Sequence, residues 1–544
     1  MGWWERLGSP SRRIVAVAAV VMALGVVVSV AVLGPGRGLS RTSADSPGSP
    51  SDPSTPTSIA SPTSVTSVTS ATSVTMPPAV PTSVERMHVD VVIYGSTTSG
   101  LGAIRGLKMA MARNPQDLTV ALVSVGDALE SPLTQGLCVE DDYEPGTISG
   151  FYQEFRSAVA LHYETLGVWP YERNGRLTYE PEVATDVLSH LVFGDQGLPE
   201  AARGRVRIVR VTGIIAEASD AEGDRYVVLT RPDDSRLRLD TRYLLDASVE
   251  ADLARALGCR YMMGRADGVY DDVRGPLPAK PTRADLYAAS PQSLGCLVTL
   301  ASVPGGAPPI REREDWTAAE KAEGARWQMD EKTLKTFPNS WSMRHRLPGG
   351  KHELNELWSD LADPDIIVQW YRDPESREGI VRMLQQRILV LLAQVQDRYP
   401  EVGIDRLPTW PYVRGEVMVL GTHLYSTDEL KANPGETIAT GKYAVFDRHD
   451  PVHGSLQPDE AATVFVPLAV TRPVSHPYLL VSTALSVDWK AYNSACRMEP
   501  VRATVGMACG VQLALAAAHD VAPRTIAYPE IRAELLALGH VPER

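Results

Sequence analysis

The chain has 544 residues, of which 44% are hydrophobic and 22% are charged, and its formal net charge at pH 7 is −13. These proportions are typical of a folded protein with at least two units, so global disorder is excluded. The sequence has no Lys/Arg-rich stripe and no zinc-finger spacing, which argues against a nucleic-acid partner and favours a small-molecule substrate.

The N-terminus carries a candidate membrane anchor. Residues 14–33 are an uncharged apolar stretch, about the length that a helix needs to cross a hydrocarbon core of roughly 30 Å. Arg6, Arg12 and Arg13 precede it, and such a positive flank holds the N-terminus in the cytoplasm and the rest of the chain outside. The arginine pair fits either a twin-arginine export signal or an ordinary anchor flank. Because no A-x-A cleavage site follows, we expect residues 1–37 to be retained as a transmembrane signal anchor rather than released.

Residues 38–86 are rich in Ser, Thr and Pro. Such a segment cannot bury enough apolar surface to offset its ordering entropy, so we interpret it as a disordered stalk that leaves the folded part outside the membrane. The cysteines are widely spaced and form no C-x-x-C pattern, which favours buried small hydrophobes over metal ligands or disulfides; they are Cys138, Cys259, Cys296, Cys496 and Cys509. No metal site is expected, because motifs such as H-E-x-x-H are missing from the sequence.

A strand, a turn and a helix are predicted at the start of the folded part. Residues 89–94 are a β-branched run, Gly95-Ser96-Thr97-Thr98-Ser99-Gly100 is the turn, and residues 101–112 are helical in pattern. In dinucleotide-binding folds such a turn and the helix N-terminus bind a pyrophosphate. Thr97 replaces the middle glycine of G-x-G-x-x-G, so an ordinary strand-to-helix turn remains the alternative.

Two further strand regions fit this fold. A second strand is predicted at 119–123, and Ser124 stands where an acidic residue normally bonds the ribose. Residues 205–245 alternate apolar and polar residues in short runs, the pattern of an antiparallel meander. The meander ends at Asp246, which either reaches a bound cofactor or caps a helix that begins near Val249.

Two helices are predicted further along the chain. Residues 380–399 place their apolar residues on one face, which indicates a core helix. Residues 500–519 carry a series of small residues, which allows either the close approach of a ligand or tight packing; they are Ala503, Gly506, Ala508 and Gly510.

Several fragments, in order and spacing, carry a family resemblance; they lie at 89–100, 133–137, 178–184, 243–253, 411–414, 441–449 and 497–510. Together they resemble the bacterial FAD-dependent oxidoreductases with a glutathione-reductase-like FAD/NAD(P)-binding fold, some of which are related to xanthan lyases. The resemblance implies an α/β fold with FAD as the cofactor. A Rossmann-like FAD-binding domain, with a central parallel sheet and a β-meander, is expected at 87–264 and 473–544, and an inserted mixed α+β substrate domain at 265–472.

The resemblance also implies site residues. The N-terminus of the helix at 500–519 is expected against the flavin pyrimidine ring, where its positive dipole stabilises negative charge. The implied cofactor-binding residues are Gly95, Thr97, Thr98, Ser99, Gly100, Ser124, Thr134, Gln135, Gly136, Val211, Asp246, Ala247, Arg497, Gly506 and Gly510.

His449 and Arg414 are the candidate catalytic residues. His449 follows Asp447 by two residues, and histidine is the side chain most often used as a proton acceptor near neutral pH, but a surface-loop histidine is the alternative. Arg414 either clamps a substrate anion or belongs to a structural ion pair.

The chain departs from the family pattern at positions that should face the flavin. Glu130 and Ser131 replace paired glycines, Thr483 and Ala484 replace a Gly-Arg pair, and Lys490 replaces a common histidine. Two hypotheses remain. The first is an FAD-dependent oxidoreductase that transfers hydride from a small, carbohydrate-like extracytoplasmic substrate to the flavin. The second is a non-catalytic cell-surface binding protein with a degenerate flavoprotein fold.

Overall fold

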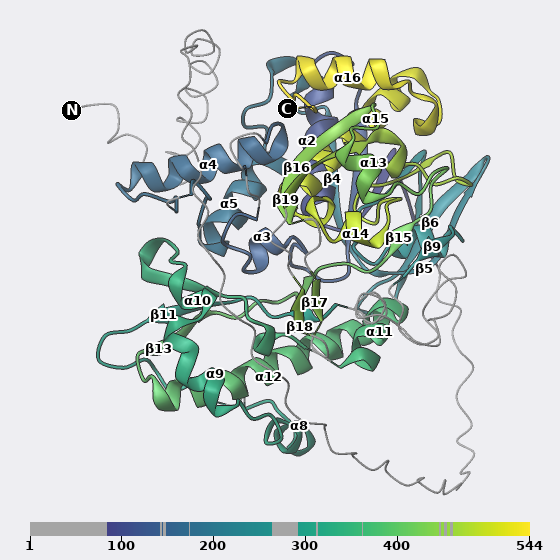
Figure 1. The fold of residues 1–544 in the computed structure, drawn as a ribbon. Coiled ribbons are helices and arrows are strands. Elements are labelled where there is room, and N and C mark those ends of the chain that lie inside the picture. Colours follow the sequence, from purple (N-terminus) through teal and green to yellow (C-terminus); the bar gives the residue numbers. More distant parts are fainter. Residues whose placement is uncertain are drawn as a thin grey trace, which may run out of the picture.

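The computed structural model describes residues 84–263 and 292–543, apart from short gaps at 142–143, 145–147, 173, 312–313, 362, 445–447, 451–453 and 457–460 (Figure 1). The predicted anchor at 14–33 with its arginine pair, and the predicted stalk up to residue 83, lie outside the described residues. The same holds for residues 265–291 at the start of the expected substrate domain.

A parallel sheet of five strands lies at the centre of the molecule. Its order is β20-β8-β2-β3-β4, and its strands are β2 (Val91–Tyr94), β3 (Leu118–Ser124), β4 (Val206–Thr212), β8 (Tyr243–Asp246) and β20 (Leu479–Val481). Runs of Val, Ile and Leu fill the inner strands, as expected where both faces of a parallel sheet are covered. Strand β20 pairs with β8, Leu480 opposite Leu245, so the sheet joins two segments that are far apart in the sequence. The predicted α/β class and central parallel sheet are confirmed.

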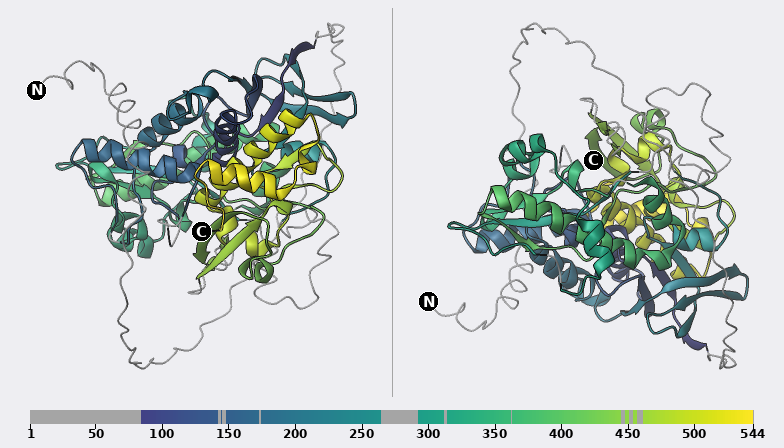
Figure 2. Two further views of the ribbon diagram at one scale, coloured as in Figure 1. Left: turned by 90° about the horizontal axis from the view of Figure 1, so that it is seen from above. Right: turned by 90° about the horizontal axis from the view of Figure 1, so that it is seen from below.

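Helices α2 (Thr98–Ala110) and α15 (Glu499–His519) pack closely against each other. A Cβ on Gly506 would lie 2.0 Å from the Ser99 carbonyl oxygen, and one on Gly510 would lie 2.0 Å from that of Ala103. The small residues of α15 therefore serve tight packing, and the surface they pack on is another helix. Figure 2 shows the N-terminal segment (purple) against the C-terminal helices (yellow).

Helix α15 is also long and apolar enough to span a membrane, the one such helix within the described part of the chain. However, 94% of its most apolar window is buried inside the protein. We therefore assign α15 to the core.

A second sheet covers the first, with the order β1-β7-β6-β5. Its strands are β1 (Glu85–His88), β5 (Ile214–Ala221), β6 (Asp224–Thr230) and β7 (Arg236–Asp240). The meander predicted at 205–245 is thus too long at both ends, because β4 and β8 belong to the central sheet. Strand β4 is partly exposed like the meander strands, and β8 is buried but only four residues long, so the sequence pattern did not separate either of them from the meander.

The other helices divide between two regions of the molecule. The upper region in Figure 1 holds α3 (Pro132–Gln135), α4 (Phe151–Thr165), α5 (Pro181–Val192), α13 (Thr427–Lys431), α14 (Trp489–Tyr492) and α16 (Tyr528–Ala537). Helix α6 (Asp252–Ala256) contacts β5 and β8. The lower region holds α8 (Ala318–Gly324), α9 (Glu331–Thr336), α10 (Trp341–Arg344), α11 (Pro364–Arg372) and α12 (Arg377–Arg398). The helix predicted at 380–399 is confirmed as α12.

Short strands connect these helices. A three-stranded sheet in the lower region has β11 (Val298–Ser302) between β12 (Lys351–Leu354) and β13 (Val402–Arg406). The remaining strands pair in twos: β10 (Leu294–Gly295) with β14 (Tyr412–Val413), β9 (Tyr261–Met262) with β15 (Met418–Val419), β16 (Thr437–Ala444) with β19 (Ala461–Pro467), and β17 (Arg448–Asp450) with β18 (Gly454–Leu456). The mixed α+β character expected of the inserted region is present in its described part.

Candidate functional site

The turn between β2 and α2 is built around two glycines. Gly95 has φ of +105°, and a Cβ there would lie 2.6 Å from the Ser248 amide nitrogen. A Cβ on Gly100 would lie 2.2 Å from the Gly95 carbonyl oxygen. Both positions therefore require glycine, the first for the tight turn and the second for close packing of the helix start against the turn and the end of β8, as in dinucleotide-binding folds.

Thr97 ties this turn to the end of β8. Its hydroxyl donates to the Ala247 carbonyl at 2.7 Å and accepts from the Gly100 amide at 3.4 Å, which caps α2. A glycine at this position could make neither side-chain contact.

The hydroxyls that follow Thr97 are bonded to other hydroxyls inside the protein. The Ser99 oxygen lies 2.6 Å from the Thr483 hydroxyl and 3.0 Å from the Ser482 hydroxyl. The Thr98 hydroxyl lies 2.7 Å from that of Ser131. These side chains are buried, so the start of α2 is linked to β20 and to the 130–131 segment without any bound ligand.

Glu130 places a carboxylate at the turn itself. Its Oε2 accepts from the Ser96 amide at 3.0 Å, and its Oε1 accepts from the Val125 amide at 2.7 Å. In return, the Glu130 amide donates to the Ser96 hydroxyl at 3.1 Å. The side chain is buried, and burial raises the pKa of Glu130 to about 7. Glu130, which the sequence placed at a position that should face the flavin, therefore bonds the Ser96 amide directly after the first glycine of the turn.

A buried group of charges adjoins Glu130. Arg377 of α12 forms two hydrogen bonds with the Asp252 carboxylate, at 2.6 and 2.9 Å, and Asp252 also lies 3.8 Å from Arg255. Glu250 accepts from the Trp370 indole at 2.8 Å. The Tyr94 hydroxyl is buried and has no hydrogen-bond partner in the described part of the chain. Sequence reasoning missed this group, because Arg377 lies 125 positions from Asp252 and no local pattern connects them.

Asp246 takes the helix-capping role that the sequence left open. Its Oδ1 accepts from the Ser248 amide at 2.9 Å, and its Oδ2 accepts from the Ala254 amide in α6 at 2.8 Å. Burial raises the pKa of Asp246 to about 7. The Ser124 hydroxyl at the end of β3 donates to the Gly126 carbonyl at 2.6 Å, so it bonds within its own loop.

The remaining predicted cofactor residues lie on neighbouring segments. Thr134 donates to the Ser131 carbonyl at 2.8 Å, and the Gln135 oxygen accepts from the Thr409 amide at 3.0 Å. Gly136 has φ of +118°, and a Cβ there would lie 2.0 Å from the Leu297 carbonyl oxygen. Val211 lies in β4 opposite Val123.

Two buried arginines stand at the N-terminus of α15. Arg497 donates to the Tyr412 hydroxyl at 3.0 Å. Arg502 pairs with Glu499 at 2.8 Å and donates to the Tyr492 hydroxyl at 3.1 Å. Glu499 balances the charge of Arg502, so an ion pair stands beside Arg497 at the helix N-terminus, where the resemblance expects the flavin ring. Arg502 was not predicted, although it stands within the matching fragment at 497–510.

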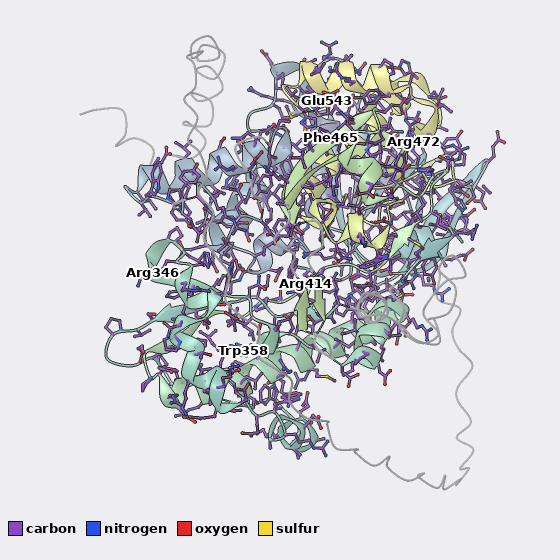
Figure 3. All side chains as sticks on the ribbon, viewed as in Figure 1. Arg346, Trp358, Arg414, Phe465, Arg472 and Glu543 are labelled. Carbon is purple, nitrogen blue, oxygen red and sulfur yellow. The ribbon has the colours of Figure 1, made fainter. Side chains whose placement is uncertain are left out.

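The two candidate catalytic residues differ in their surroundings. Arg414 is buried, pairs with Asp360 at 3.0 Å and donates to the Ser293 carbonyl at 3.1 Å. Figure 3 shows it between the upper and lower regions, and these contacts are those of a structural ion pair. His449 lies in β17 opposite Ser455, and its side chain is outside the described part of the structure.

The buried carboxyls predict a pH dependence of stability. Glu130 and Asp246 have pKa values of about 7 in the folded chain, against ordinary values of 4.5 and 3.8. Between about pH 4 and pH 7 the folded state therefore binds more protons than the unfolded state, so the free energy of unfolding should fall as pH rises through this window. Urea unfolding at half-unit pH steps measures it. Glu130→Gln should flatten the slope, and an unchanged slope would contradict the assignment to Glu130.

All five cysteines are buried and free, so the prediction of buried small hydrophobes is confirmed.

Comparison with known proteins gives one family match. The model of the family described as FAD dependent oxidoreductase matches residues 90–535. No curated protein matches the chain.

Solved structures show only distant similarity. A flavoprotein/dehydrogenase from Cytophaga hutchinsonii is 9% identical over 83% of this chain and 84% of that one, with a TM-score of 0.32. The p-nitrophenol 4-monooxygenase from Pseudomonas putida is 12% identical over 83% and 84%, with a TM-score of 0.32. L-proline dehydrogenase from P. horikoshii is 18% identical with a TM-score of 0.18; the match covers 30% of this chain and only 23% of that one. At TM-scores this low, only the family match bears on function.

Proposed function

Because the chain belongs to the family of FAD-dependent oxidoreductases, we propose that it is a redox enzyme that uses FAD to oxidise a small molecule. The observation that carries this proposal is the family match, which spans the central sheet, the glycine turn and α15. FAD supplies the hydride-accepting chemistry when bound, so the protein has to bind, orient and shield the reactants.

The backbone of the turn has the shape that this cofactor requires. Gly95 and Gly100 let the chain turn tightly, because a Cβ at either position would meet neighbouring backbone, and the turn lies at the end of β2 where a dinucleotide is bound in this class of sheet. The turn and the N-terminus of α2 would hold the pyrophosphate. The fit is incomplete at one point, since the Ser96 amide is bonded to Glu130.

The chain's own residues supply the electrostatics at the other end of the site. Arg497 is buried at the N-terminus of α15, where fixed positive charge stabilises a developing anion, and Arg502 is balanced by its ion pair with Glu499. Arg414 orients this region, because Asp360 pairs with its guanidinium and the Arg414 backbone carbonyl accepts a hydrogen bond from Arg502 at 2.9 Å. We retain His449 as the proposed proton acceptor, on the sequence argument alone.

We further propose a carbohydrate-like substrate in the extracytoplasmic space. An open groove of about 910 Å³ lies beside Trp169 and is also lined by Glu172, Asn174 and Arg344. Trp169 is 73% exposed, and its ring centroid lies 5.0 Å from that of Tyr171. An exposed indole face beside planar polar side chains offers both the apolar surface and the hydrogen bonds that suit a sugar ring. The location rests on the basic flank and apolar run at the N-terminus.

The absorption spectrum of the purified full chain tests the proposed function. We expect a flavin band at roughly 450 nm, and bleaching of this band when a suitable substrate is added without air. Heat release of the chromophore followed by its chromatographic identification distinguishes FAD from FMN.

A non-catalytic binding protein is the second candidate. The internal bonding of Glu130, Thr98 and Ser99 favours it, because these groups are satisfied without a cofactor. A colourless protein that neither takes up FAD nor is stabilised by it against heat would make this the better account.

A further inference from the structure

We infer that Glu130 is an internal competitor of the cofactor: its carboxylate occupies the Ser96 amide, directly after the first glycine of the dinucleotide turn, and it has to leave before FAD can bind fully. This inference rests on the proposed function, since it presupposes a dinucleotide site at the turn.

The first argument is the identity of the two donors that hold the carboxylate. Ser96 directly follows the first glycine of the turn after β2, and Val125 directly follows β3. In this class of fold the ends of these two strands face the phosphates and the ribose of the nucleotide. The Glu130 oxygens lie 3.0 and 2.7 Å from the two amides. Carboxylate and phosphate oxygens use backbone amides in the same way, so one anion excludes the other.

The second argument is the charge that surrounds Glu130. Tyr94 comes from β2, Glu250 and Asp252 from the segment that leads into α6, and Arg377 from α12. Asp246 lies at the end of β8. Four carboxyls thus share this region with two arginines, Arg377 and Arg255, and Asp252 holds both of them. With Glu130 ionised, a pyrophosphate would enter a region that already has excess negative charge.

The third argument is that replacing Glu130 should change two measurable properties in opposite directions, the stability of the flavin-free protein and the affinity for FAD. In the flavin-free protein the carboxylate satisfies two buried amides, so removing it lowers stability. In the presence of FAD its removal frees the same amides and takes away a repelling charge, so affinity rises. A residue that only supports the turn would lower both properties when replaced.

The experiment uses the flavin-free full chain in detergent, titrated with FAD by quenching of flavin fluorescence and heated to measure Tm. Glu130→Gln keeps the shape and removes the charge, and Glu130→Gly removes the side chain. For both we expect a lower Tm without FAD at pH 5, where Glu130 is protonated and the cost of burying its charge does not offset the lost hydrogen bonds. At pH 8 the Kd for FAD should fall by up to about tenfold, the size expected for a charged hydrogen-bond partner. Wild-type affinity should also rise when pH falls from 8 to 6, and this rise should become smaller in Glu130→Gln, where Asp246 still titrates in the same window.

Glu140→Gln is the matched control. Glu140 is also a buried carboxylate, and it accepts from the Leu177 amide at 2.9 Å and pairs with Arg156 at 3.1 Å. Neither of these partners belongs to the turn. This variant should lose stability and keep both the wild-type Kd for FAD and its pH dependence.

The other outcomes overturn the inference, and they show whether the proposed function fails with it. If Glu130→Gln binds FAD as tightly as wild type or more weakly, Glu130 is not a competitor, and the proposed function stands. If neither wild type nor either variant binds FAD, the inference and the proposed function fail together. Should both variants fail to fold, the wild-type titration decides: an FAD affinity that does not rise between pH 8 and 6 rejects the competitor.

Discussion

Gly506→Val should destabilise the protein by about 3 kcal/mol or more, because the added atoms have no space. The first added carbon would lie 2.0 Å from the Ser99 carbonyl oxygen and 2.8 Å from the Ser99 Cα. Both are backbone atoms at the start of α2, which cannot rotate away as a flexible side chain could. Helix α15 would have to move off α2, and the turn that begins at Gly95 would move with it.

Guanidinium chloride unfolding of the flavin-free chain measures this loss, and FAD affinity should fall in parallel. Gly379→Ala is the control, since Gly379 lies in α12 with no atom within 4 Å of the added carbon. That substitution should stabilise the protein by about 0.5–1 kcal/mol through the helix preference of alanine. A Gly506→Val variant as stable as wild type would mean that α2 and α15 are not in close contact.

The sequence predicted those parts of the fold that depend on local pattern. The strand, turn and helix around Gly95 are recognisable from β-branched residues, glycines and helical spacing over about twenty positions. The placement of β20 beside β8 has no local signal, because Leu480 and Leu245 are brought together only by the folded chain. The family resemblance suggested only that residues 473–544 belong to the same domain as residues 87–264.

The candidate site was predicted less completely, for a physical reason. Sequence spacing identifies where backbone must approach a ligand, and Gly95 and Gly100 were found in this way. It does not show which polar groups bond to each other. Ser99 pairs with Thr483 from 384 positions away, and the contact of Glu130 with Ser96 depends on a loop that folds back on the turn. The small residues of α15 were recognised, but only the structure shows that they face α2.

Arg377→Met is expected to destabilise the protein by about 3–5 kcal/mol at pH 8, because it leaves buried carboxylates without their main counter-charge. Arg377 is fully buried, bonds Asp252 through two nitrogens and donates to the Trp370 carbonyl at 2.9 Å. These contacts join α12 of the lower region to α6 beside the central sheet. The substituted methionine has similar length, so the lost charge rather than a cavity dominates.

Urea unfolding of three variants separates charge from packing. Arg377→Met combined with Asp252→Asn should recover much of the loss, since the second change removes the carboxylate that the first leaves unpaired. The control on the same helix is Arg382→Met: Arg382 pairs with Asp315 at 3.0 Å, and its side chain is 38% exposed, so solvent screens the pair and the effect should be much smaller. Lowering the pH to 5 should also reduce the loss in Arg377→Met, because protonation neutralises the carboxyls that have lost their partner. If the double variant were no more stable than Arg377→Met, the loss would come from packing around Trp370, and the charge balance proposed for the region beside Glu130 would be wrong.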